Sequence, residues 1–469
     1  MYNNKNYMEV AGVSDEVREL FNERLKRYQA AIALAPTDRI PIAPGTNYFA
    51  EVYSGFTNQE YMYDASKWIE ADRKFIQDFP ETDVLRTTRV WGPIQDVLGF
   101  NTYKLPGREL PPCVQFQFIE GERMKLDEYD ILIRNPAEFL FEIFLPRVFN
   151  EMRERGSIRS YVAFLKGGLA QGVWNNLLKS RAQFLENEMG MPLASMGLIL
   201  APFDALADGL RGLRGIMVDV HKRPEKILEA CETLIPELVN AALAAADPLR
   251  RYPIFMPLHR GCYPFLSPKQ FDELYWPSLK KTVQMLIDAG YTVRAYLEGN
   301  WGPNWHHWRE LPRGKVLLDI DGPGDIFKAK EDLGGYQCIA GGLSDSLLVL
   351  GTPDEVRERV KLLCETVGKD GGFIISGGCN IPYDTKPENY RAMIDAILEY
   401  GRYRDKTEFE VQCNPNPPAG WQPPKQRMIT PWEVKKAELG EIKGDEDLIR
   451  MHWEMFERMA YNWLWNWTW

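Results

Sequence analysis

The sequence lacks the patterns that mark a disulfide scaffold, a zinc ribbon, a secreted protein or a membrane protein. Its seven cysteines are scattered through 469 residues with no Cys-x-x-Cys pair, which argues against a disulfide framework and a zinc ribbon. No run approaches the ~18 consecutive apolar residues of a membrane-spanning helix. The first residues, Met1-Tyr2-Asn3-Asn4-Lys5, lack the apolar segment of a signal peptide. We therefore expect a cytoplasmic protein with no membrane partner.

Positive charge is also in short supply. Lys and Arg number 56 against 66 Asp and Glu, so the net charge is −10, and nothing favours nucleic acid or an anionic membrane surface as a partner. The motifs Gly-x-Gly-x-x-Gly and Gly-x-x-x-x-Gly-Lys-Ser/Thr do not occur, which argues against a dinucleotide-binding turn and a P-loop. What the sequence does have is 45% apolar residues, enough for a large core.

Apolar periodicity predicts helices and strands in alternation. Helices are predicted over 15–34, 225–246, 271–288 and 353–367, and strands over 40–42, 252–257, 291–297, 316–320, 337–340 and 373–375. The last of these helices begins after Thr352, with Glu355 placed to complete a capping box. Repeated strand–helix units indicate a parallel sheet. Because no nucleotide-binding turn is present, we expect an α/β protein built on a closed (β/α)8 TIM barrel rather than an open sheet.

The composition divides the chain into three parts. Residues 1–135 hold the N-terminal helix, the first strand and an aromatic and proline-rich capping segment, residues 136–403 the main part of the barrel, and residues 404–469 a Pro-rich linker and a Trp-rich extension. Half of the 14 tryptophans lie in the extension: Trp421, Trp432, Trp453, Trp463, Trp465, Trp467 and Trp469. An exposed tail of this kind would aggregate, so we expect it to pack over the barrel or across a homodimer interface. A membrane-interface anchor is the weaker alternative, since its last stretch has almost no Lys or Arg.

Cys379 follows the predicted strand 373–375 and the small residues Ser376-Gly377-Gly378. Glycines let the backbone turn tightly there, and in an α/β barrel the C-terminal ends of the strands carry the chemistry. Cys379 is therefore a candidate site residue, and a buried structural cysteine is the alternative.

Two further residues come directly after predicted strands. Glu298 could be a metal ligand or a general acid or base, and the alternative is a carboxylate paired with a neighbouring Arg. His259, in His259-Arg260-Gly261, could be an imidazole ligand or acid, although a lone histidine is more often structural. Together Glu298, Cys379 and His259 suit zinc, which accepts nitrogen, oxygen and sulfur and can keep one position open for substrate.

Other candidates lie near the same strand ends. Asp319 and Asp321 point to opposite sides of a strand end, and we expect Asp321, the residue past the strand, to face the site as an acid–base group beside Glu298. Side chains expected to bind substrate are Tyr48, Tyr296, Asn300 and Trp301.

Several segments resemble the uroporphyrinogen decarboxylase superfamily. They are Arg24–Arg27 with Asp38–Pro41, Ser267–Phe271 with Trp276–Lys281, Gly351–Val356, Gly371–Ile374, Cys379–Pro382 and Lys386–Asn389. The resemblance covers residues 20–403 and is most specific after residue 255. It implies a (β/α)8 barrel and either porphyrinogen decarboxylation or corrinoid-dependent methyl transfer.

Individual residues separate these two branches. The decarboxylase resemblance implies an arginine-rich loop that grips porphyrinogen carboxylates, whereas residues 44–51 contain no arginine. The methyltransferase resemblance implies a His-x-Cys pair and a later Cys that bind zinc. Cys379 matches the later Cys, but Tyr296 and Glu298 stand where the His-x-Cys pair would be. The resemblance therefore implies zinc held by Glu298, Cys379 and His259, with Glu298, Asp321 and His259 as catalytic residues.

A carboxylate in place of a thiolate makes the site harder and leaves more positive charge on the metal, which favours departure of an ether oxygen as alkoxide or phenolate. We therefore expect a cobalamin-dependent methyltransferase that moves methyl between a small substrate, such as a methoxylated aromatic or another O-methyl compound, and a corrinoid protein. The cobalamin should arrive on that partner because the signature Asp-x-His-x-x-Gly is absent. The alternatives are a metal-assisted or acid–base decarboxylase or lyase, and a non-catalytic ligand-binding barrel.

Overall fold

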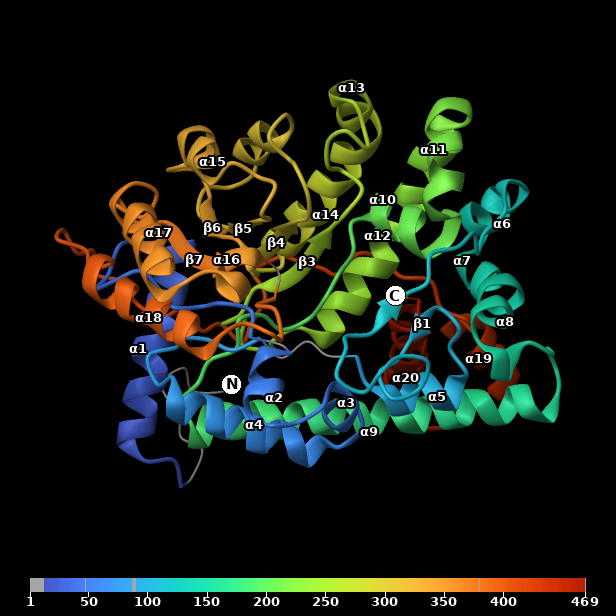
Figure 1. Cartoon of the computed structure of the whole chain (residues 1–469). Coiled ribbons are helices and arrows are strands. Elements are labelled where there is room, and N and C mark those ends of the chain that lie inside the picture. Colours follow the sequence, from blue (N-terminus) through green and yellow to red (C-terminus); the bar gives the residue numbers. More distant parts are fainter. Residues whose placement is uncertain (1–11, 47, 87–89, 379, 469) are drawn as a thin grey trace.

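A parallel sheet lies at the centre of the molecule (Figure 1). The computed structural model describes residues 12–46, 48–86, 90–378 and 380–468. The sheet contains β3 (Ile254–Leu258), β4 (Val293–Leu297), β5 (Val316–Ile320), β6 (Cys338–Leu343) and β7 (Phe373–Gly377). These strands lie in chain order and every adjacent pair is parallel. The predicted α/β class and parallel sheet are therefore confirmed.

Backbone bridges continue the pairing beyond both edges of this sheet. Ile42 pairs in parallel with Ile375 of β7, and Asp83 donates its N–H to the Ile42 carbonyl at 2.8 Å. Further parallel bridges join Leu85 to Leu193 and Leu198 to Phe255 of β3. Three short extended segments thus connect the β7 edge with the β3 edge. The strand predicted at 40–42 is present only as such bridges, because Pro41 has no N–H to donate to a ladder.

The strands and their bridged neighbours enclose a small core of their own. Its buried members include Ala43, Val84, Ala194, Leu317, Cys338, Ala340 and Ile374. Helix α1 (Asp15–Ile32) contributes Tyr28, whose hydroxyl donates to the Ala194 carbonyl at 2.7 Å. Arg294 also lies inside and pairs with Asp319, which accepts a hydrogen bond from Ser376 at 3.0 Å. These buried polar side chains therefore have partners within the protein, either other side chains or a backbone carbonyl.

Most of the other elements are helices packed around the strands. The N-terminal part contains α2 (Phe49–Tyr53), α3 (Asn58–Tyr63), α4 (Ala65–Asp78), α5 (Gly92–Leu98), α6 (Tyr129–Arg134), α7 (Pro136–Phe139), α8 (Leu145–Val148) and the antiparallel pair β1 (Tyr103–Lys104) and β2 (Gln117–Phe118). The middle and C-terminal parts contain α9 (Ile158–Glu188), α10 (Pro202–Asp204), α11 (Gly212–Lys222), α12 (Pro224–Ala245), α13 (Pro268–Gln270), α14 (Trp276–Asp288), α15 (Ile326–Leu333), α16 (Asp345–Leu350), α17 (Pro353–Glu365), α18 (Pro387–Tyr400), α19 (Trp432–Leu439) and α20 (Glu446–Asn466). The remaining turns are 3-10 helical at Leu126–Glu128, Asn150–Met152 and Trp305–Glu310 and π-helical at Leu140–Phe144, Ala205–Arg211 and Phe271–Tyr275.

The predicted helices are present with ends that differ by at most two residues, and one of them is interrupted. The capping box of Thr352 and Glu355 is present at the start of α17. The helix predicted over 271–288 instead begins as a π-helical turn, Phe271–Tyr275, and becomes α-helical only at Trp276. Pro277, in the first turn of α14, has no backbone N–H to donate. Carbonyl groups in the preceding turn therefore accept hydrogen bonds from residues further along the chain, which is the π-helical pattern.

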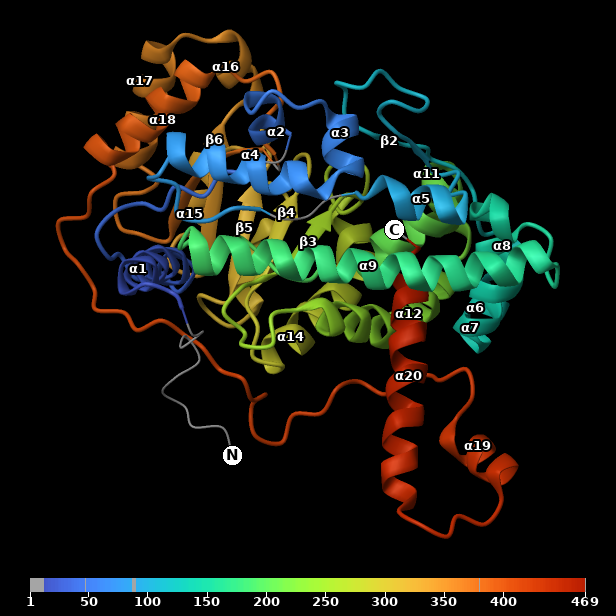
Figure 2. The ribbon, with the colours of Figure 1, turned by 90° about the horizontal axis from the view of Figure 1, so that it is seen from below.

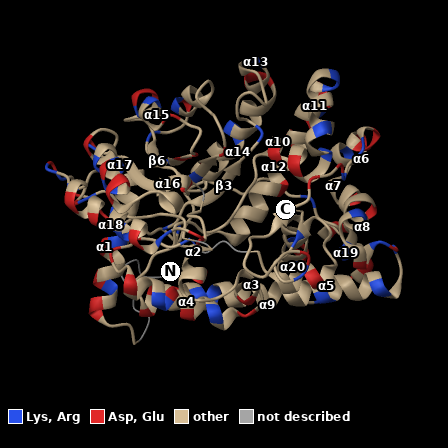
Figure 3. Ribbon diagram, in the orientation of Figure 1, with Lys and Arg blue, Asp and Glu red and all other residues tan. Residues whose placement is uncertain are grey.

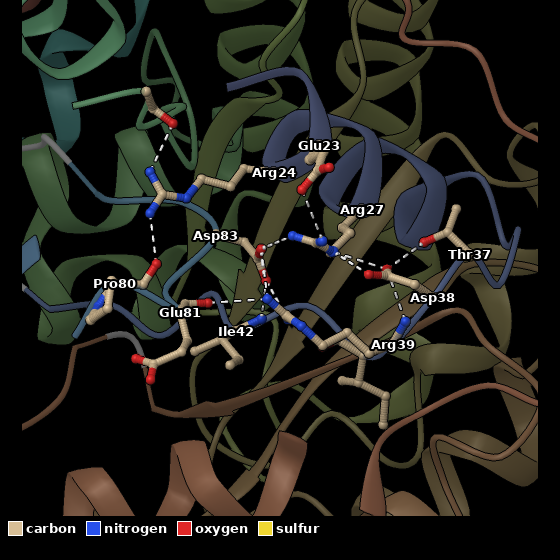
Figure 4. Close-up of polar contacts among 12 residues, drawn as sticks. Glu23, Arg24, Arg27, Thr37, Asp38, Arg39, Ile42, Pro80, Glu81 and Asp83 are labelled. Atoms are coloured by element: carbon tan, nitrogen blue, oxygen red, sulfur yellow. Dashed lines mark hydrogen bonds and ion pairs between the residues drawn. The ribbon is translucent and has the colours of Figure 1, made fainter. Parts of the chain in front are cut away.

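A network of buried ions holds α1 to the first two extended segments (Figure 4). The Asp83 carboxylate, which is fully buried, pairs with Arg39 at 2.6 Å and with Arg27 at 3.1 Å. It also accepts the N–H of Ile42 at 2.8 Å, while Arg27 reaches Asp38 at 2.7 Å. The Asp83 carboxylate is therefore shared by two arginines and joins three segments of the chain, and Asp38 supplies the second negative charge.

The C-terminal extension packs on the outer helices. The C-terminal end of α20 is buried against α12 through Tyr461, Leu464 and Trp465, and the Trp467 indole N–H donates to Gln171 of α9 at 3.0 Å. The rest of α20 projects from the body together with α19 (Figure 2). The tryptophans thus anchor the base of the extension to the protein's own helices.

Charges of both signs are interspersed on the outer helices (Figure 3). Within the described residues, no helix combines the length and the apolar character that crossing a membrane requires.

Candidate functional site

His259 and Glu298 lie side by side where β3 and β4 end. The register of the two strands pairs Leu258 with Leu297, so the residue after each strand meets its neighbour across the sheet. The distance from His259 Nε2 to Glu298 Oε2 is 3.5 Å. Two of the residues predicted from the sequence to form the site are therefore in direct contact.

Two aspartates from another part of the chain support His259. Asp208 accepts a hydrogen bond from His259 Nδ1 at 2.7 Å, and it also pairs with Arg260. Asp204, which is fully buried, accepts the backbone N–H groups of His259 and Arg260 at 2.9 and 3.0 Å and the Tyr275 hydroxyl at 2.8 Å. With Nδ1 held by Asp208, the imidazole turns Nε2 toward Glu298.

The surrounding carboxylates favour the doubly protonated, positively charged form of the His259 imidazole. Burial alone would lower the pKa of the imidazole, but the hydrogen bond to Asp208 and the charges of Asp204, Asp208 and Glu298 raise that pKa to about 9. Burial, aided by the charge of Asp208, raises the pKa of Asp204 to about 6. Burial also opposes ionisation of Asp208, yet its contacts with His259 and Arg260 lower its pKa. A metal bound at Nε2 would take the place of one proton.

The His259–Glu298 pair fits the donors of a zinc ion. Nitrogen and oxygen ligands at 2.0–2.1 Å on adjacent corners of a tetrahedron lie about 3.3 Å apart, close to the observed 3.5 Å. A carboxylate on the second imidazole nitrogen is the usual support for a metal-bound histidine. Among the described residues, which omit Cys379, no group of three or more His, Cys, Asp and Glu side chains is placed to hold a metal.

Asp321 holds the turn that carries Glu298. Its Oδ1 accepts the Tyr296 hydroxyl at 2.8 Å and its Oδ2 accepts the Gly299 N–H at 3.0 Å. Gly299 has φ +85°, and a Cβ there would lie 3.3 Å from Cys262 Sγ, so glycine is required at this turn. Both oxygens of Asp321 therefore have donors within the protein, and its position suits support of Glu298.

The residues expected to bind substrate have different surroundings. Tyr296 is buried and bonded to Asp321, and Tyr48 precedes α2 with φ +71°. Trp301 is buried against Tyr275 and donates its indole N–H to the Glu298 carbonyl at 3.0 Å. Asn300 is exposed and closes a local turn by accepting the Gly302 N–H. Trp301 thus supports the turn from within the core, whereas Asn300 lies at the surface.

Cys379 lies outside the described residues, but its neighbours on both sides are placed. A Cβ at Gly378 would lie 3.3 Å from Asp345 Oδ1, and the Ile381 N–H donates to the Gly45 carbonyl at 2.6 Å. Burial, with the charges of Asp321 and Asp384, raises the pKa of Asp345. Gly378 therefore lies beside an acidic side chain, and Ile381 lies beside the first extended segment.

The sequence reasoning missed Asp204, Asp208 and Arg86. Asp204 and Asp208 are four residues apart after the extended segment that contains Leu198, so a pair of carboxylates past a strand was the available signal. Arg86 directly follows the apolar Val84 and Leu85 and is 6% exposed.

Arg86 reaches across the interior to two other strands. Its guanidinium lies 4.2 Å from the ring centroid of Phe255 in β3, and it donates to Asn380 Oδ1, just after β7, at 3.3 Å. These partners come from opposite sides of its own segment, so the cation lies within the enclosed interior near the ends of the strands.

Comparisons with known proteins agree with this architecture. Residues 177–400 match the family model "Uroporphyrinogen decarboxylase (URO-D)". The chain is 28% identical over 137 residues to a uroporphyrinogen decarboxylase of Pseudoalteromonas translucida (strain TAC 125), covering 29% of this chain and 38% of the relative. It is 23% identical over 217 residues to one of Anaeromyxobacter dehalogenans (strain 2CP-C), covering 44% of this chain and 58% of the relative.

The fold is also similar to that of a solved methyltransferase from Methanosarcina mazei. The TM-score is 0.56 at 18% sequence identity, and the likeness covers 80% of this chain and 98% of the other. The curated relatives are matched over less than two thirds of their length, while the structural likeness spans nearly all of the methyltransferase. Residues 177–400, just under half of the chain, thus match the uroporphyrinogen decarboxylase family, and the curated relatives named above are uroporphyrinogen decarboxylases.

Proposed function

We infer that β3 to β7 and the three bridged segments around Ile42, Leu85 and Leu193 are the eight strands of a (β/α)8 barrel. The bridges that run from β7 back to β3 and the core inside them support this reading. The C-terminal ends of barrel strands carry the active site, which is where His259 and Glu298 lie.

We propose that the protein is a cobalamin-dependent methyltransferase that moves a methyl group between a small O-methyl substrate and a corrinoid protein. The observation that carries the proposal is the contact of His259 Nε2 with Glu298 Oε2 at 3.5 Å, with Nδ1 held by Asp208. A nitrogen and a hard oxygen donor at one mouth of the barrel suit a Lewis-acidic ion. The likeness to a methyltransferase fold supports the same class.

Zinc would be held by Glu298 and His259, with Cys379 as the third ligand. When bound, zinc supplies a Lewis acid that withdraws electron density from an ether oxygen. Asp208 keeps the proton on Nδ1 so that Nε2 remains the donor. Asp321, through the Gly299 N–H, holds the turn that presents Glu298.

The transfer balances as a displacement at the methyl carbon. The C–O bond breaks and its electron pair stays on the oxygen, which leaves as phenolate or alkoxide and is protonated by water. A cobalt(I) corrinoid on a partner protein would supply the electron pair for the new bond to the methyl carbon. No other oxidant or reductant is consumed in this step.

A methoxylated aromatic with a negatively charged group is the substrate class that suits the interior. Arg86 places a positive charge beside the Phe255 ring, and Tyr296 lies along the same face of β4 as Glu298 because side chains alternate. Arg86 would attract a carboxylate and the aromatic side chains would contact the ring.

The test is demethylation in the presence of a corrinoid protein in its cobalt(I) state. With zinc and a methoxybenzoate, we expect the corrinoid absorption spectrum to change and the hydroxybenzoate to accumulate, as measured by mass spectrometry. Glu298→Gln should lower the rate by at least roughly 10-fold, the scale of lost support at a metal site. Glu365→Gln, an exposed glutamate on α17, is the matched control and should leave the rate unchanged.

Paired thiol variants identify the third ligand. Cys379→Ala should lose bound zinc, as elemental analysis would measure, whereas Cys262→Ala, whose sulfur is near Gly299, should retain it. Full zinc retention in Cys379→Ala would contradict the proposed ligand set.

Two other outcomes would replace the proposed reaction. Release of carbon dioxide from a carboxylated substrate without any corrinoid would assign a decarboxylase, the activity named for the curated relatives. Tight binding of a methoxylated arene without turnover under any condition would assign a ligand-binding barrel.

A further inference from the structure

A cluster of polar side chains fastens the C-terminal extension to α12. Asn240 of α12 donates its side-chain N–H to the Pro424 carbonyl of the linker at 2.9 Å. Two residues further on, Gln426 Nε2 donates to Asn462 Oδ1 of α20 at 2.6 Å. The linker therefore contacts both helices at this point. We call the polar side chains that meet here the latch: Glu237, Asn240, Gln426, Tyr461 and Asn462.

Glu237 is the acidic member of the latch, and it is only 1% exposed. Its carboxyl group lies within hydrogen-bonding reach of the Gln426 side chain and of the Arg427 backbone N–H. Oε2 of Glu237 nevertheless has no hydrogen-bond partner among the residues that the structure describes, and the same is true of Gln426 Oε1. The latch thus contains two buried acceptor oxygens with no donor from these residues, which costs free energy.

A proton on Glu237 supplies such a donor. The neutral carboxyl group carries one O–H, whereas the carboxylate can only accept hydrogen bonds. Loss of the proton would also place a negative charge in a contact that excludes water. Burial raises the pKa of Glu237 to about 7, against the opposing effects of Gln426 and Arg427. The docked extension therefore favours the protonated acid.

The groups that face Glu237 from the linker and from α20 compensate its charge poorly. Arg427 is exposed, and its guanidinium donates to the Arg134 carbonyl at the end of α6. Burial, with the charge of Glu237, raises the pKa of Tyr461, so this residue stays a neutral phenol. Neither group brings a full positive charge to the carboxylate.

The other helices packed on α12 do not compensate the charge either. They are α6, α10, α11 and α14, and among the described residues none of their charges acts on the pKa of Glu237. Charged side chains on these helices have partners of their own: Asp130 with Lys226, Asp204 with the His259 backbone, Asp219 with Arg211 and Lys281 with Glu232.

We propose that the latch is a proton-linked fastening, which holds the C-terminal extension on α12 when Glu237 is protonated and loosens as the pH rises toward neutrality. In the open state Glu237 reaches water and regains its ordinary pKa of about 4.5. The equilibrium constant for opening therefore rises between pH 4.5 and 7 and then levels off, a gain of roughly 70-fold from pH 5 to pH 8. Leu464 and Trp465 remain packed against α12, so high pH weakens the attachment without abolishing it. The latch is independent of the reaction at the mouth of the barrel.

The test is amide hydrogen exchange of the full-length protein at pH 5 and pH 8, followed by mass spectrometry. Dividing each rate by the intrinsic rate at the same pH gives a protection factor that reports opening. For residues 458–468 we expect the protection factor to fall at least about 10-fold from pH 5 to pH 8. In Glu237→Gln this fall should disappear, because the amide is neutral at both pH values. Peptides from α17 should keep their protection throughout.

Glu232→Gln is the matched control, since Glu232 lies on the same helix but is exposed and pairs with Lys281. This variant should keep the pH dependence of the unmodified chain. Equal protection of residues 458–468 at both pH values in the unmodified chain would overturn the latch, and so would a pH dependence that survives in Glu237→Gln. A parallel loss of protection in α17 would mean that the whole molecule opens, which would overturn a local fastening.

Discussion

At the residue scale, the candidate site depends on how one imidazole is oriented. His259 has a carboxylate at each ring nitrogen, Asp208 at 2.7 Å and Glu298 at 3.5 Å. The two contacts differ in setting, because Asp208 is nearly buried whereas Glu298 is exposed. Asp208, the buried partner, fixes the orientation of the imidazole ring. Glu298, the exposed partner, is placed to bind the same metal ion as His259.

Asp208→Asn should therefore weaken zinc binding without removing a ligand. We expect the zinc dissociation constant to rise roughly 10- to 100-fold, because the hydrogen bond that orients a metal-bound histidine is lost. Chelator competition measures this directly and needs no substrate. Asp272→Asn is the matched control, since Asp272 bonds His307 at 2.8 Å on the exposed surface. Equal zinc affinity in both variants would show that Asp208 does not act through the metal.

A second residue-scale prediction concerns Glu237 of α12. Burial raises the pKa of Glu237 to about 7, so the folded protein keeps a proton that the unfolded chain releases near its ordinary pKa of about 4.5. As pH rises from about 4.5 to 7, folding is increasingly opposed, and above 7 the penalty stays at about 3 kcal/mol.

Glu237→Gln removes this penalty and should stabilise the protein at pH 8 by about 3 kcal/mol but at pH 5 by less than about 1 kcal/mol. Urea unfolding at the two pH values measures the difference. The same stabilisation at both would contradict ionisation as its cause.

At the scale of elements, the apolar runs of the sequence predicted the strands well. The prediction failed in detail where proline interrupts the backbone, at Pro41 in the first extended segment and at Pro277 in α14. Residue propensity alone does not indicate whether a proline ends a helix or strand or only changes the helical turn beside it. A proline leaves one backbone carbonyl without its usual N–H donor, and the packing of neighbouring elements decides which other donor that carbonyl finds.

The ion network at Asp83 joins several elements of the N-terminal part. Asp83→Ala leaves Arg27 and Arg39 partly or fully buried without their shared carboxylate, and we expect it to lower the free energy of unfolding by about 3–5 kcal/mol. Chemical denaturation measures the change. Glu23→Ala is the control: Glu23 is 66% exposed and 3.5 Å from Arg27, so its loss should cost under about 1 kcal/mol. An equal loss of unfolding free energy in both variants would show that the burial of Asp83 does not determine its contribution to stability.

At the scale of the whole molecule, the C-terminal extension is joined to the rest through α12 and α9. Trp465 is 2% exposed, and Trp465→Ala should lower the free energy of unfolding by about 3–5 kcal/mol, the usual result of removing a buried indole. We expect far-ultraviolet circular dichroism and tryptophan fluorescence to follow one shared transition, in the variant as in the unmodified chain. Two separate transitions would mean that residues 404–469 fold as an independent unit.

The sequence by itself determined the α/β class and the placement of His259 and Glu298 after strands, because apolar runs, glycine turns and strand ends are local features. Only the tertiary structure decided that these two residues touch, since that depends on the register of β3 with β4. It also brought Asp204 and Asp208 to His259 from more than one helix away. Local sequence carries no information about which distant segment supplies a hydrogen bond, and the packing of helices around the strands settles it.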